Sequence, residues 1–171
     1  MLIGITGRAG VGKDTLADRL VALHGYTKYS LATPIKALLN ARFGWDMEQW
    51  IDRNWKENGH AGGYSPRSWA QWLGTEVGRT IAGADVWVNL MADAYQECGV
   101  NMVVPDVRFD NEARCIENMD GVIIKLERPD APSVNAHVSE AGISQIYINY
   151  TFINRGTKDE LLAAVETALK L

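Results

Sequence analysis

Short runs of apolar residues alternate along the chain with segments in which apolar residues recur every three or four positions. The runs are typical of buried strands, and the spaced segments are typical of helices with one buried face. We expect strands over residues 2–6, 26–30, 101–104, 122–126 and 148–152. Short apolar strands that alternate with helices favour a parallel sheet covered by helices on both faces. The pattern therefore predicts an α/β protein.

Capping signals mark where the helices begin. Thr33 and Ser65 each precede a proline, which is a typical helix start. Thr157 begins a capping-box pattern, Asp46 begins a similar one before a short helix, and Asp110 is also expected to cap a helix. We expect the longer helices over residues 14–23, 34–43, 66–81, 85–97, 111–119 and 158–169.

The stretch from about residue 35 to residue 98 interrupts this alternation. It is helical in pattern, rich in tryptophan, and broken by a glycine-containing loop over residues 58–64. We expect a helical insertion packed on the sheet of a single domain, whose core comprises about residues 1–34 and 99–171. Several aromatic residues are expected to serve packing, while the role of Trp87 stays open. The packing set is Tyr26, Trp45, Trp50, Trp55 and Tyr64.

Composition and charge narrow the class of protein. Hydrophobic residues make up 47% of the 171 residues and charged residues 22%, which excludes disorder, collagen and a coiled coil. The apolar runs are too short to span a bilayer. The net charge of −4 argues against a nucleic-acid groove, since duplex binding leaves a basic footprint. A local pocket for a small anion is compatible with this charge.

The cysteines and the first residues bear on the compartment. Cys98 and Cys115 fit neither a disulfide framework nor a zinc spacing, so we expect reduced thiols. The apolar stretch at residues 1–7 is too short for a signal peptide and lacks a basic leader. We therefore expect a cytoplasmic protein that has no membrane partner.

The segment over residues 7–15, Gly-Arg-Ala-Gly-Val-Gly-Lys-Asp-Thr, follows a predicted strand and opens a predicted helix. In this context glycines let successive N–H groups converge on an anion, and the helix N-terminus adds partial positive charge. Lys13 supplies a full charge for the outer phosphates. A chance glycine-rich turn is the alternative, but strand, loop and helix agree on a phosphate-binding loop (P-loop). Its expected nucleotide contacts are Gly7, Arg8, Gly10, Val11, Gly12, Lys13, Asp14 and Thr15.

Acidic residues near this loop are candidate magnesium ligands. A typical P-loop has Ser or Thr directly after the lysine, whereas this chain has Asp14 and then Thr15. A carboxylate can hold Mg²⁺ directly or through water. Asp106 follows the strand at residues 101–104, at the sheet edge where ligands bind in such folds. Asp106 either binds metal or orients a substrate, or it is a loop or capping residue.

Phosphoryl transfer requires cations around the transferred group, and arginine suits this role because it binds phosphate with two hydrogen bonds. Arg8 and Arg67 are candidates by type. Arg128 begins a proline-containing loop that suits a lid, or is a surface residue. Arg108 either contacts phosphate or bridges to Glu112.

Another set of residues is a candidate for acceptor binding. Trp72, Glu76 and Arg79 are spaced to share one helix face, where an indole could stack on a base and an arginine could hold a phosphate. Core packing explains Trp69 and Trp72 at least as well. Lys36 follows a helix start and could meet a monophosphate, and His137 could touch substrate.

Taken together, several segments resemble the deoxynucleoside monophosphate kinases encoded by bacteriophages, and the resemblance covers nearly the whole chain in order. An aspartate after the P-loop lysine is fairly specific to a few P-loop kinases, so the unusual Asp14 supports the resemblance. The matching segments are Gly-Lys-Asp-Thr at 12–15, Ala-Thr-Pro-Ile-Lys at 32–36, Trp-Leu-Gly-Thr-Glu-Val-Gly-Arg at 72–79, Asp-Val-Trp-Val at 85–88, Asp-Val-Arg-Phe-Asp-Asn-Glu at 106–112, His-Val-Ser-Glu at 137–140 and Asn-Arg-Gly-Thr at 154–157.

The resemblance implies a P-loop kinase fold with a five-stranded parallel sheet, a helical monophosphate-binding insertion over about 35–98 and a short lid over about 128–138. It implies transfer of the γ-phosphoryl group of ATP, with Mg²⁺, to a deoxynucleoside monophosphate. The roles that it implies are ATP and metal binding for Lys13, Asp14 and Thr15, monophosphate binding for Lys36, Arg79, Asp106 and Arg108, and the lid arginine for Arg128.

Rival functions share the P-loop. A P-loop kinase for another small acceptor, such as dephospho-coenzyme A, would differ mainly in the insertion. A nucleotide-dependent switch would bind ATP or GTP without phosphorylating anything, and the acceptor-side candidates speak against it. We expect that the helical insertion could form a homodimer. If the chain is encoded by a phage, we expect the protein in the cytoplasm of the host.

Overall fold

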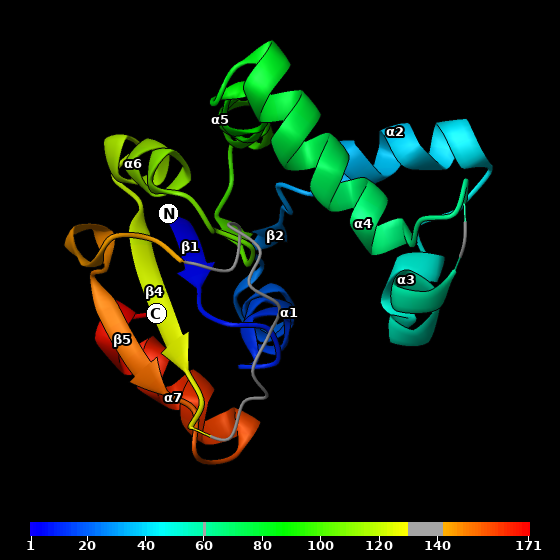
Figure 1. Ribbon diagram of the computed structural model, residues 1–171. Coiled ribbons are helices and arrows are strands. Elements are labelled where there is room, and N and C mark those ends of the chain that lie inside the picture. The colour runs from blue at the N-terminus through cyan, green and yellow to red at the C-terminus, as the bar shows by residue number, and fades with distance from the viewer. Residues whose placement is uncertain (60, 130–141) are drawn as a thin grey trace. The chain divides into compact units, whose positions relative to one another are not determined.

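The computed structural model describes residues 1–59, 61–129 and 142–171 (Figure 1). Its sheet has five strands in the order β2-β3-β1-β4-β5, and all four pairings are parallel. This confirms the predicted α/β class. The strands are β1 (Leu2–Thr6), β2 (Thr27–Lys28), β3 (Met102–Val104), β4 (Val122–Glu127) and β5 (Tyr150–Ile153).

Helical segments connect these strands, and no helix of the described residues is long and apolar enough to cross a membrane. The α-helices are α1 (Lys13–His24), α2 (Thr33–Phe43), α3 (Arg53–Asn58), α4 (Pro66–Gln71), α5 (Val86–Cys98), α6 (Asp110–Asn118) and α7 (Lys158–Leu169). The other segments are the 3₁₀ turns η1 (Gln49–Ile51) and η4 (Gln145–Tyr147), and the π-helical segment η2 (Trp72–Ala82).

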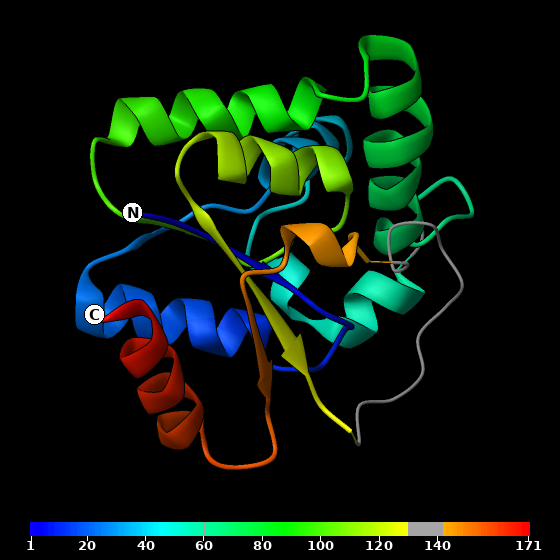
Figure 2. The same ribbon diagram turned by 90° about the vertical axis from the view of Figure 1, so that its left-hand side faces the viewer.

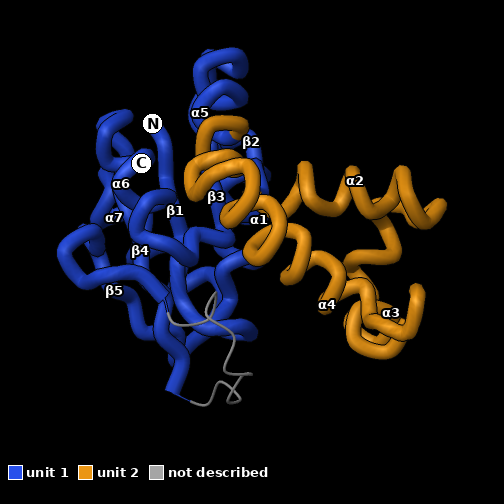
Figure 3. The backbone as a smooth tube through the Cα atoms, turned by 45° about the horizontal axis from the view of Figure 1, so that its top comes forward, with its two compact units in different colours: residues 1–30, 91–171 blue, residues 31–90 orange. Residues whose placement is uncertain are grey.

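The chain divides into two compact units, which Figure 3 shows in different colours. Unit 1 comprises residues 1–30 and 91–171, and unit 2 comprises residues 31–90. All strands belong to unit 1, whereas α2 to η2 belong to unit 2 and α5 crosses the boundary. Unit 2 overlaps most of the segment expected as an insertion. How that segment packs on the sheet stays a prediction.

The core of unit 1 lies between the sheet and the helices α1 and α7. Leu16 and Leu20 of α1 pack there with Leu162 and Val165 of α7 against the apolar residues of β1 and β4. Helix α6 covers the opposite face (Figure 2). A β-carbon on Gly4 of β1 would lie 2.8 Å from Cδ1 of Ile116 in that helix. Every residue of β1 is buried because both faces of the sheet are covered.

Some helix starts follow the predicted capping signals. The Ser65 hydroxyl accepts a hydrogen bond from the N–H of Ser68, and the Thr157 hydroxyl accepts one from the N–H of Glu160. Asp46 exchanges side-chain and backbone hydrogen bonds with Gln49, directly before η1. The predictions for Ser65 and Thr157 are confirmed, whereas the cap position of η1 is Glu48 and not Asp46.

Other predicted boundaries are wrong. Helix α2 already includes Thr33, and its cap position is Ala32. Helix α6 begins at Asp110 itself, because the Asp110 carboxylate is engaged by Ser144 and Glu112 accepts the N–H of Phe109 instead. Helix α3 was not expected from the sequence. Strands β2 and β5 are both shorter than predicted. For β5 the reason is that the turn η4 precedes it, so the strand begins only at Tyr150.

Trp87 is a packing residue of unit 2. Its indole N–H donates a 2.7 Å hydrogen bond to the carbonyl oxygen of Gly74, and its side chain is buried. A β-carbon on Gly78 would lie 2.4 Å from the Trp87 ring. The helix therefore needs glycine at position 78 to admit the indole, which gives Trp87 a packing role.

The other aromatic residues of unit 2 form a chain of ring contacts, as expected for packing. Trp45, Trp50 and Trp55 meet edge to face with centroids 5.1–5.8 Å apart. Tyr26, in unit 1, is buried as predicted. Tyr64 differs, because 61% of it is exposed and its ring meets that of Trp69 edge to face.

Candidate functional site

The glycine-rich loop (residues 7–12) connects the end of β1 to the start of α1, as the sequence predicts. Gly7, Gly10 and Gly12 have φ angles of 135°, 80° and 105°, which side-chain-bearing residues rarely adopt. The cap residue of α1 is Gly12, which has no side chain that could bond to the first turn. Backbone N–H groups at an uncapped helix start, preceded by such a loop, are suited to bind an anion.

Three contacts hold this loop in place within unit 1. A β-carbon on Gly7 would lie 2.3 Å from the carbonyl oxygen of Leu126, so the loop begins directly against β4. Val11 is only 2% exposed and packs in the core. Asn154, which follows β5, donates from Nδ2 to the carbonyl oxygen of Val11 at 2.9 Å. The loop is therefore rigidly supported.

Lys13 lies over the loop that it follows. Its Nζ donates hydrogen bonds to the carbonyl oxygens of Gly7 at 2.7 Å and Arg8 at 2.8 Å. The ammonium group is thus next to the N–H groups of the loop. This is the place where an anion bound by those N–H groups would need a positive charge.

Asp14 and Asp106 are both contacted from the end of β2. Lys28 lies 2.9 Å from Asp14 and 2.9 Å from Asp18, while the Ser30 hydroxyl donates to Oδ2 of Asp106 at 2.7 Å. Asp106 follows β3, at the carboxyl edge of the sheet. The two candidate carboxylates therefore flank the same short strand.

The charges around β2 affect two ionisable groups. Burial by itself would lower the pKa of Lys28, but hydrogen bonds and attraction from Asp18 and Asp14 outweigh it and raise the pKa overall. Burial, followed by repulsion from Asp106 and Asp93, raises the pKa of Tyr29. Lys28 therefore stays charged and orients the Asp14 carboxylate, which is largely exposed.

Magnesium fits this arrangement only together with a phosphate ligand. Within residues 1–59, 61–129 and 142–171, no group of three or more His, Cys, Asp or Glu side chains could hold an ion. Mg²⁺ in phosphoryl-transfer sites is typically bound by one or two carboxylates, substrate phosphates and water. Asp14 and Asp106 match that donor set, and Thr15 follows Asp14 in the first turn of α1.

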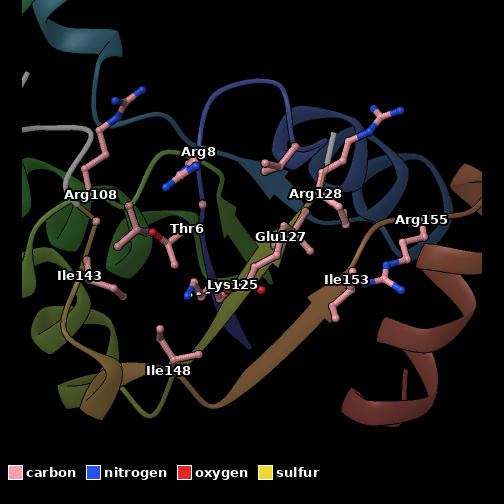
Figure 4. Close-up of a pocket in the computed structure, with 16 residues that line it drawn as sticks. Thr6, Arg8, Arg108, Lys125, Glu127, Arg128, Ile143, Ile148, Ile153 and Arg155 are labelled. Carbon is pink, nitrogen blue, oxygen red and sulfur yellow. Dashed lines mark ion pairs between the residues drawn. The ribbon is translucent and has the colours of Figure 1, made fainter. Parts of the chain in front are cut away.

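A cavity of about 680 Å³ opens at the carboxyl ends of β1, β4 and β5 (Figure 4). Its size suits a small molecule such as a nucleotide. Glu127 is the only carboxylate among the described lining residues, and Lys125 pairs with it at 2.7 Å and lowers its pKa. The cavity therefore favours anions. Its cations are Arg8, Arg108, Lys125, Arg128 and Arg155.

Arg108 and Arg128 project from opposite sides of this cavity in Figure 4. Glu112 is 4% exposed, and its Oε2 accepts the backbone N–H groups of Arg108 at 2.7 Å and Phe109 at 3.0 Å. Glu112 thus fixes the turn that carries Arg108. His137 and most of the expected lid, over 128–138, lie outside the described residues.

Unit 2 carries the remaining candidates. Exposed positions in η2 recur at Trp72, Glu76 and Thr80, whereas Arg79 is half-buried beside the buried Gly78. Arg79 therefore does not share the exposed face of Trp72 and Glu76, contrary to the prediction from the sequence. The reason is that one turn of a π-helix contains more residues than one turn of an α-helix. Half of Trp72 is exposed, although one edge of its ring meets Trp69.

Two basic candidates of unit 2 have partners there. Lys36, in α2, places its Nζ 5.7 Å from the centroid of the Trp50 ring. Arg67 forms an ion pair with Glu57 at 2.8 Å and so joins α4 to α3. The Arg67 contact gives this residue a structural role.

Lys125, Arg155 and Asn154 are site residues that the sequence analysis did not select. Lys125 is the one charged residue within the otherwise apolar run at 122–126, and that break in the pattern was an available signal. Asn154 and Arg155 begin the Asn-Arg-Gly-Thr segment at 154–157, whose place beside the loop depends on the pairing of β4 with β5. Only the fold brings that segment to the loop.

Comparisons with known proteins point to one family. The family model described as deoxynucleotide monophosphate kinase matches residues 52–165. A protein of Acanthamoeba polyphaga mimivirus, provisionally named for the same activity, is 28% identical over 96% of this chain and 94% of its own length. The deoxynucleoside-5'-monophosphate kinase of Escherichia phage T5 is 25% identical over 91% of this chain and 90% of its own length.

A solved structure shows a similar fold. The dephospho-CoA kinase from Campylobacter jejuni matches 99% of this chain and 95% of its own, with a TM-score of 0.53 and 12% identity. At this identity the likeness concerns the fold alone. It agrees with the parallel sheet and the helices described above.

Proposed function

The chain belongs to the deoxynucleotide monophosphate kinase family, and from this membership we propose that it transfers the γ-phosphoryl group of ATP to a deoxynucleoside monophosphate. The observation that carries the proposal is the glycine-rich loop at the start of α1, which borders a cation-lined cavity of about 680 Å³. A triphosphate tail needs both features, because N–H groups bind its oxygens and cations offset its charge.

The loop and Lys13 form the ATP side of the proposed site. The N–H groups of the loop would bind the inner phosphates, with Arg8 and Val11 lining the adjoining cavity. Lys13 would exchange the carbonyl oxygens of Gly7 and Arg8 for oxygens of the outer phosphates. Arg128, at the rim of the cavity, would neutralise charge on the transferred group.

Magnesium would be held by Asp14, Thr15 and Asp106. The ion would supply positive charge that offsets the negative charge of the phosphates. The contribution of the chain is to present the carboxylates, which Lys28 and Ser30 hold from the end of β2. An aspartate after the P-loop lysine therefore takes the place of the usual hydroxyl.

Each unit carries its own candidates for binding the monophosphate. Asp106 and Arg108 follow β3, and we propose that they orient the monophosphate. Lys36, Trp72, Glu76 and Arg79 come from unit 2, and His137 belongs to the same proposed set. The half-exposed Trp72 offers a ring on which a base could stack. The reaction itself needs little covalent chemistry from the protein, because in-line positioning and charge neutralisation lower the barrier.

An acceptor panel tests this function. Purified protein is incubated with ATP, Mg²⁺ and, in separate reactions, each deoxynucleoside monophosphate, each ribonucleoside monophosphate and dephospho-coenzyme A. ADP formation that depends on an added deoxynucleoside monophosphate is expected. ADP formation with dephospho-coenzyme A alone, or ATP binding without acceptor-dependent ADP formation, would favour the rival functions. Omission of Mg²⁺ should abolish turnover.

We also propose that the protein forms a homodimer through the helical unit 2. We propose further that it acts in the cytoplasm, which is the host cytoplasm if the chain is encoded by a phage. Light scattering on the purified protein tests the first of these. Nucleic acid is not an expected partner, given the net charge of −4.

A further inference from the structure

Asn154 ties the segment after β5 to the glycine-rich loop. Its Nδ2 donates to the carbonyl oxygen of Val11 at 2.9 Å. Its backbone N–H donates to the carbonyl oxygen of Glu127, the last residue of β4, at 2.7 Å. The base of the side chain is therefore fixed by the sheet, and its tip is fixed on the loop.

The geometry of the peptide bond between Val11 and Gly12 indicates what this contact does. In a trans peptide the C=O and N–H groups lie in one plane and point in opposite directions. With its C=O directed to Asn154, this peptide directs the N–H of Gly12 to the opposite side. The N–H of Gly12 belongs to the run of loop N–H groups that precedes α1.

Gly12 and Asn154 also fit each other sterically. A β-carbon on Gly12 would lie 2.9 Å from Nδ2 of Asn154, and the φ angle of Gly12 is +105°. The carboxamide thus occupies the space that a larger residue would need. At the other end of the loop, a β-carbon on Gly7 would lie closer still to its neighbour, 2.3 Å from the carbonyl oxygen of Leu126. The loop is held from β4 at one end and from the segment after β5 at the other.

We propose that Asn154 is a positioning residue for ATP. By holding the carbonyl group of Val11, it keeps the N–H of Gly12 directed at the phosphates before ATP arrives. Preorganised donors of this kind are effective because they need no rearrangement on binding. The inference rests on the proposed function insofar as ATP is the ligand of the loop.

The variants Asn154→Asp and Asn154→Ala test this role. Asp has nearly the same shape, but its carboxylate cannot donate and would repel the carbonyl oxygen of Val11. Ala removes the donor without adding charge. Both should weaken ATP binding, measured by calorimetry, on the order of 10- to 100-fold, as is typical for partners that orient binding groups. The KM for ATP should rise, while the KM for the monophosphate changes little.

Asn149 provides a matched control in the same unit. Its side chain accepts the N–H of Ile123 at 2.6 Å, so Asn149→Ala also removes a side-chain-to-backbone hydrogen bond, away from the loop. This variant should lower Tm and keep the affinity for ATP. The acceptor panel and the ATP titration are separate measurements, so the proposed acceptor can fail while the role of Asn154 holds. Unchanged ATP affinity in both Asn154 variants, or a rise in both KM values together, would overturn the inference.

Discussion

Ser30 donates a hydrogen bond of 2.7 Å from its hydroxyl group to Oδ2 of Asp106. The two residues follow β2 and β3, which are neighbouring parallel strands, so the bond joins the carboxyl ends of both strands. A carboxylate held in this way keeps one orientation when a substrate arrives. Positioning of this kind is the main contribution that a protein makes to phosphoryl transfer.

Asp106→Asn should lower kcat/KM for the monophosphate about 100-fold, because it removes the charge that orients metal or acceptor. Ser30→Ala should lower it about 10-fold, because only the orientation of the carboxylate is lost. Steady-state kinetics with varied monophosphate measures both effects. Ser144→Ala removes a similar serine-to-aspartate bond, to Asp110, and should leave kcat/KM unchanged. Equal activity of the Asp106→Asn variant and the parent protein would remove Asp106 from the site.

Lys13→Met should lower kcat by about 10²- to 10³-fold, because the transferred phosphate loses its nearest fixed charge. Coupled detection of ADP gives the rate. Lys158→Met, at the exposed start of α7, is the matched lysine control and should retain full turnover. Near-full activity of Lys13→Met would show that the phosphate site has been assigned wrongly.

Gly7→Ala should destabilise unit 1, since its β-carbon would meet the carbonyl oxygen of Leu126 and the φ of +135° is strained for alanine. A loss of about 1–3 kcal/mol in the free energy of unfolding is expected from the strain, with the clash adding to it. Denaturant titration measures the loss. Gly25→Ala, where φ is +66° and no atom lies within 4 Å, should cost only about 1–2 kcal/mol. If both variants lower the free energy of unfolding by the same amount, the close approach of Gly7 to β4 does not contribute to the effect.

Trp87→Phe should lower the free energy of unfolding by about 1–3 kcal/mol, because it removes the buried hydrogen bond to Gly74 and part of the ring. Trp72→Phe, at a half-exposed ring that packs edge to face on Trp69, should change stability by less than about 0.5 kcal/mol. Chemical denaturation of both variants makes the comparison. A smaller effect at Trp87 than at Trp72 would contradict the packing role.

Asp110 should contribute to acid sensitivity. Hydrogen bonds from the hydroxyl and then the backbone N–H of Ser144 lower the pKa of Asp110 below its ordinary value of 3.8. A carboxyl whose pKa is lower in the folded state stabilises the protein above its unfolded pKa, and the contribution disappears as the pH falls through the folded pKa. Asp110→Ala should therefore lower Tm at neutral pH, and the difference from the parent protein should shrink below pH 3.8. A difference that stays constant down to strongly acidic pH would show that this pair does not titrate as described.

The sequence predicts the sheet and the glycine-rich loop well because both depend on local patterns. Continuous apolar runs identify β1 and β3, and the glycines of residues 7–12 have the φ angles that such a loop requires. Predicted caps at Ser65 and Thr157 are confirmed for the same reason.

Features that depend on distant contacts could not be predicted. The Asp110 carboxylate accepts a hydrogen bond from Ser144, 34 positions away in the sequence, and does not cap the helix as expected. The role of Trp87 depends on glycines in the preceding helix, and the approach of Asn154 to Val11 spans 143 positions. Pairwise contacts of this range leave no periodic trace in a single sequence.

The division of the chain also bears on how acceptor preference could be altered by engineering. Every strand and the whole glycine-rich loop come from residues 1–30 and 91–171, while residues 31–90 form a compact unit with its own aromatic interior. A chimaera that exchanges this middle stretch for its counterpart from a relative would thus change the unit 2 residues proposed to bind the acceptor and leave the glycine-rich loop unaltered. Because α5 runs through residue 90, the downstream splice belongs ahead of Val86, and the counterpart needs a glycine in place of Gly78 so that Trp87 of the retained helix still fits.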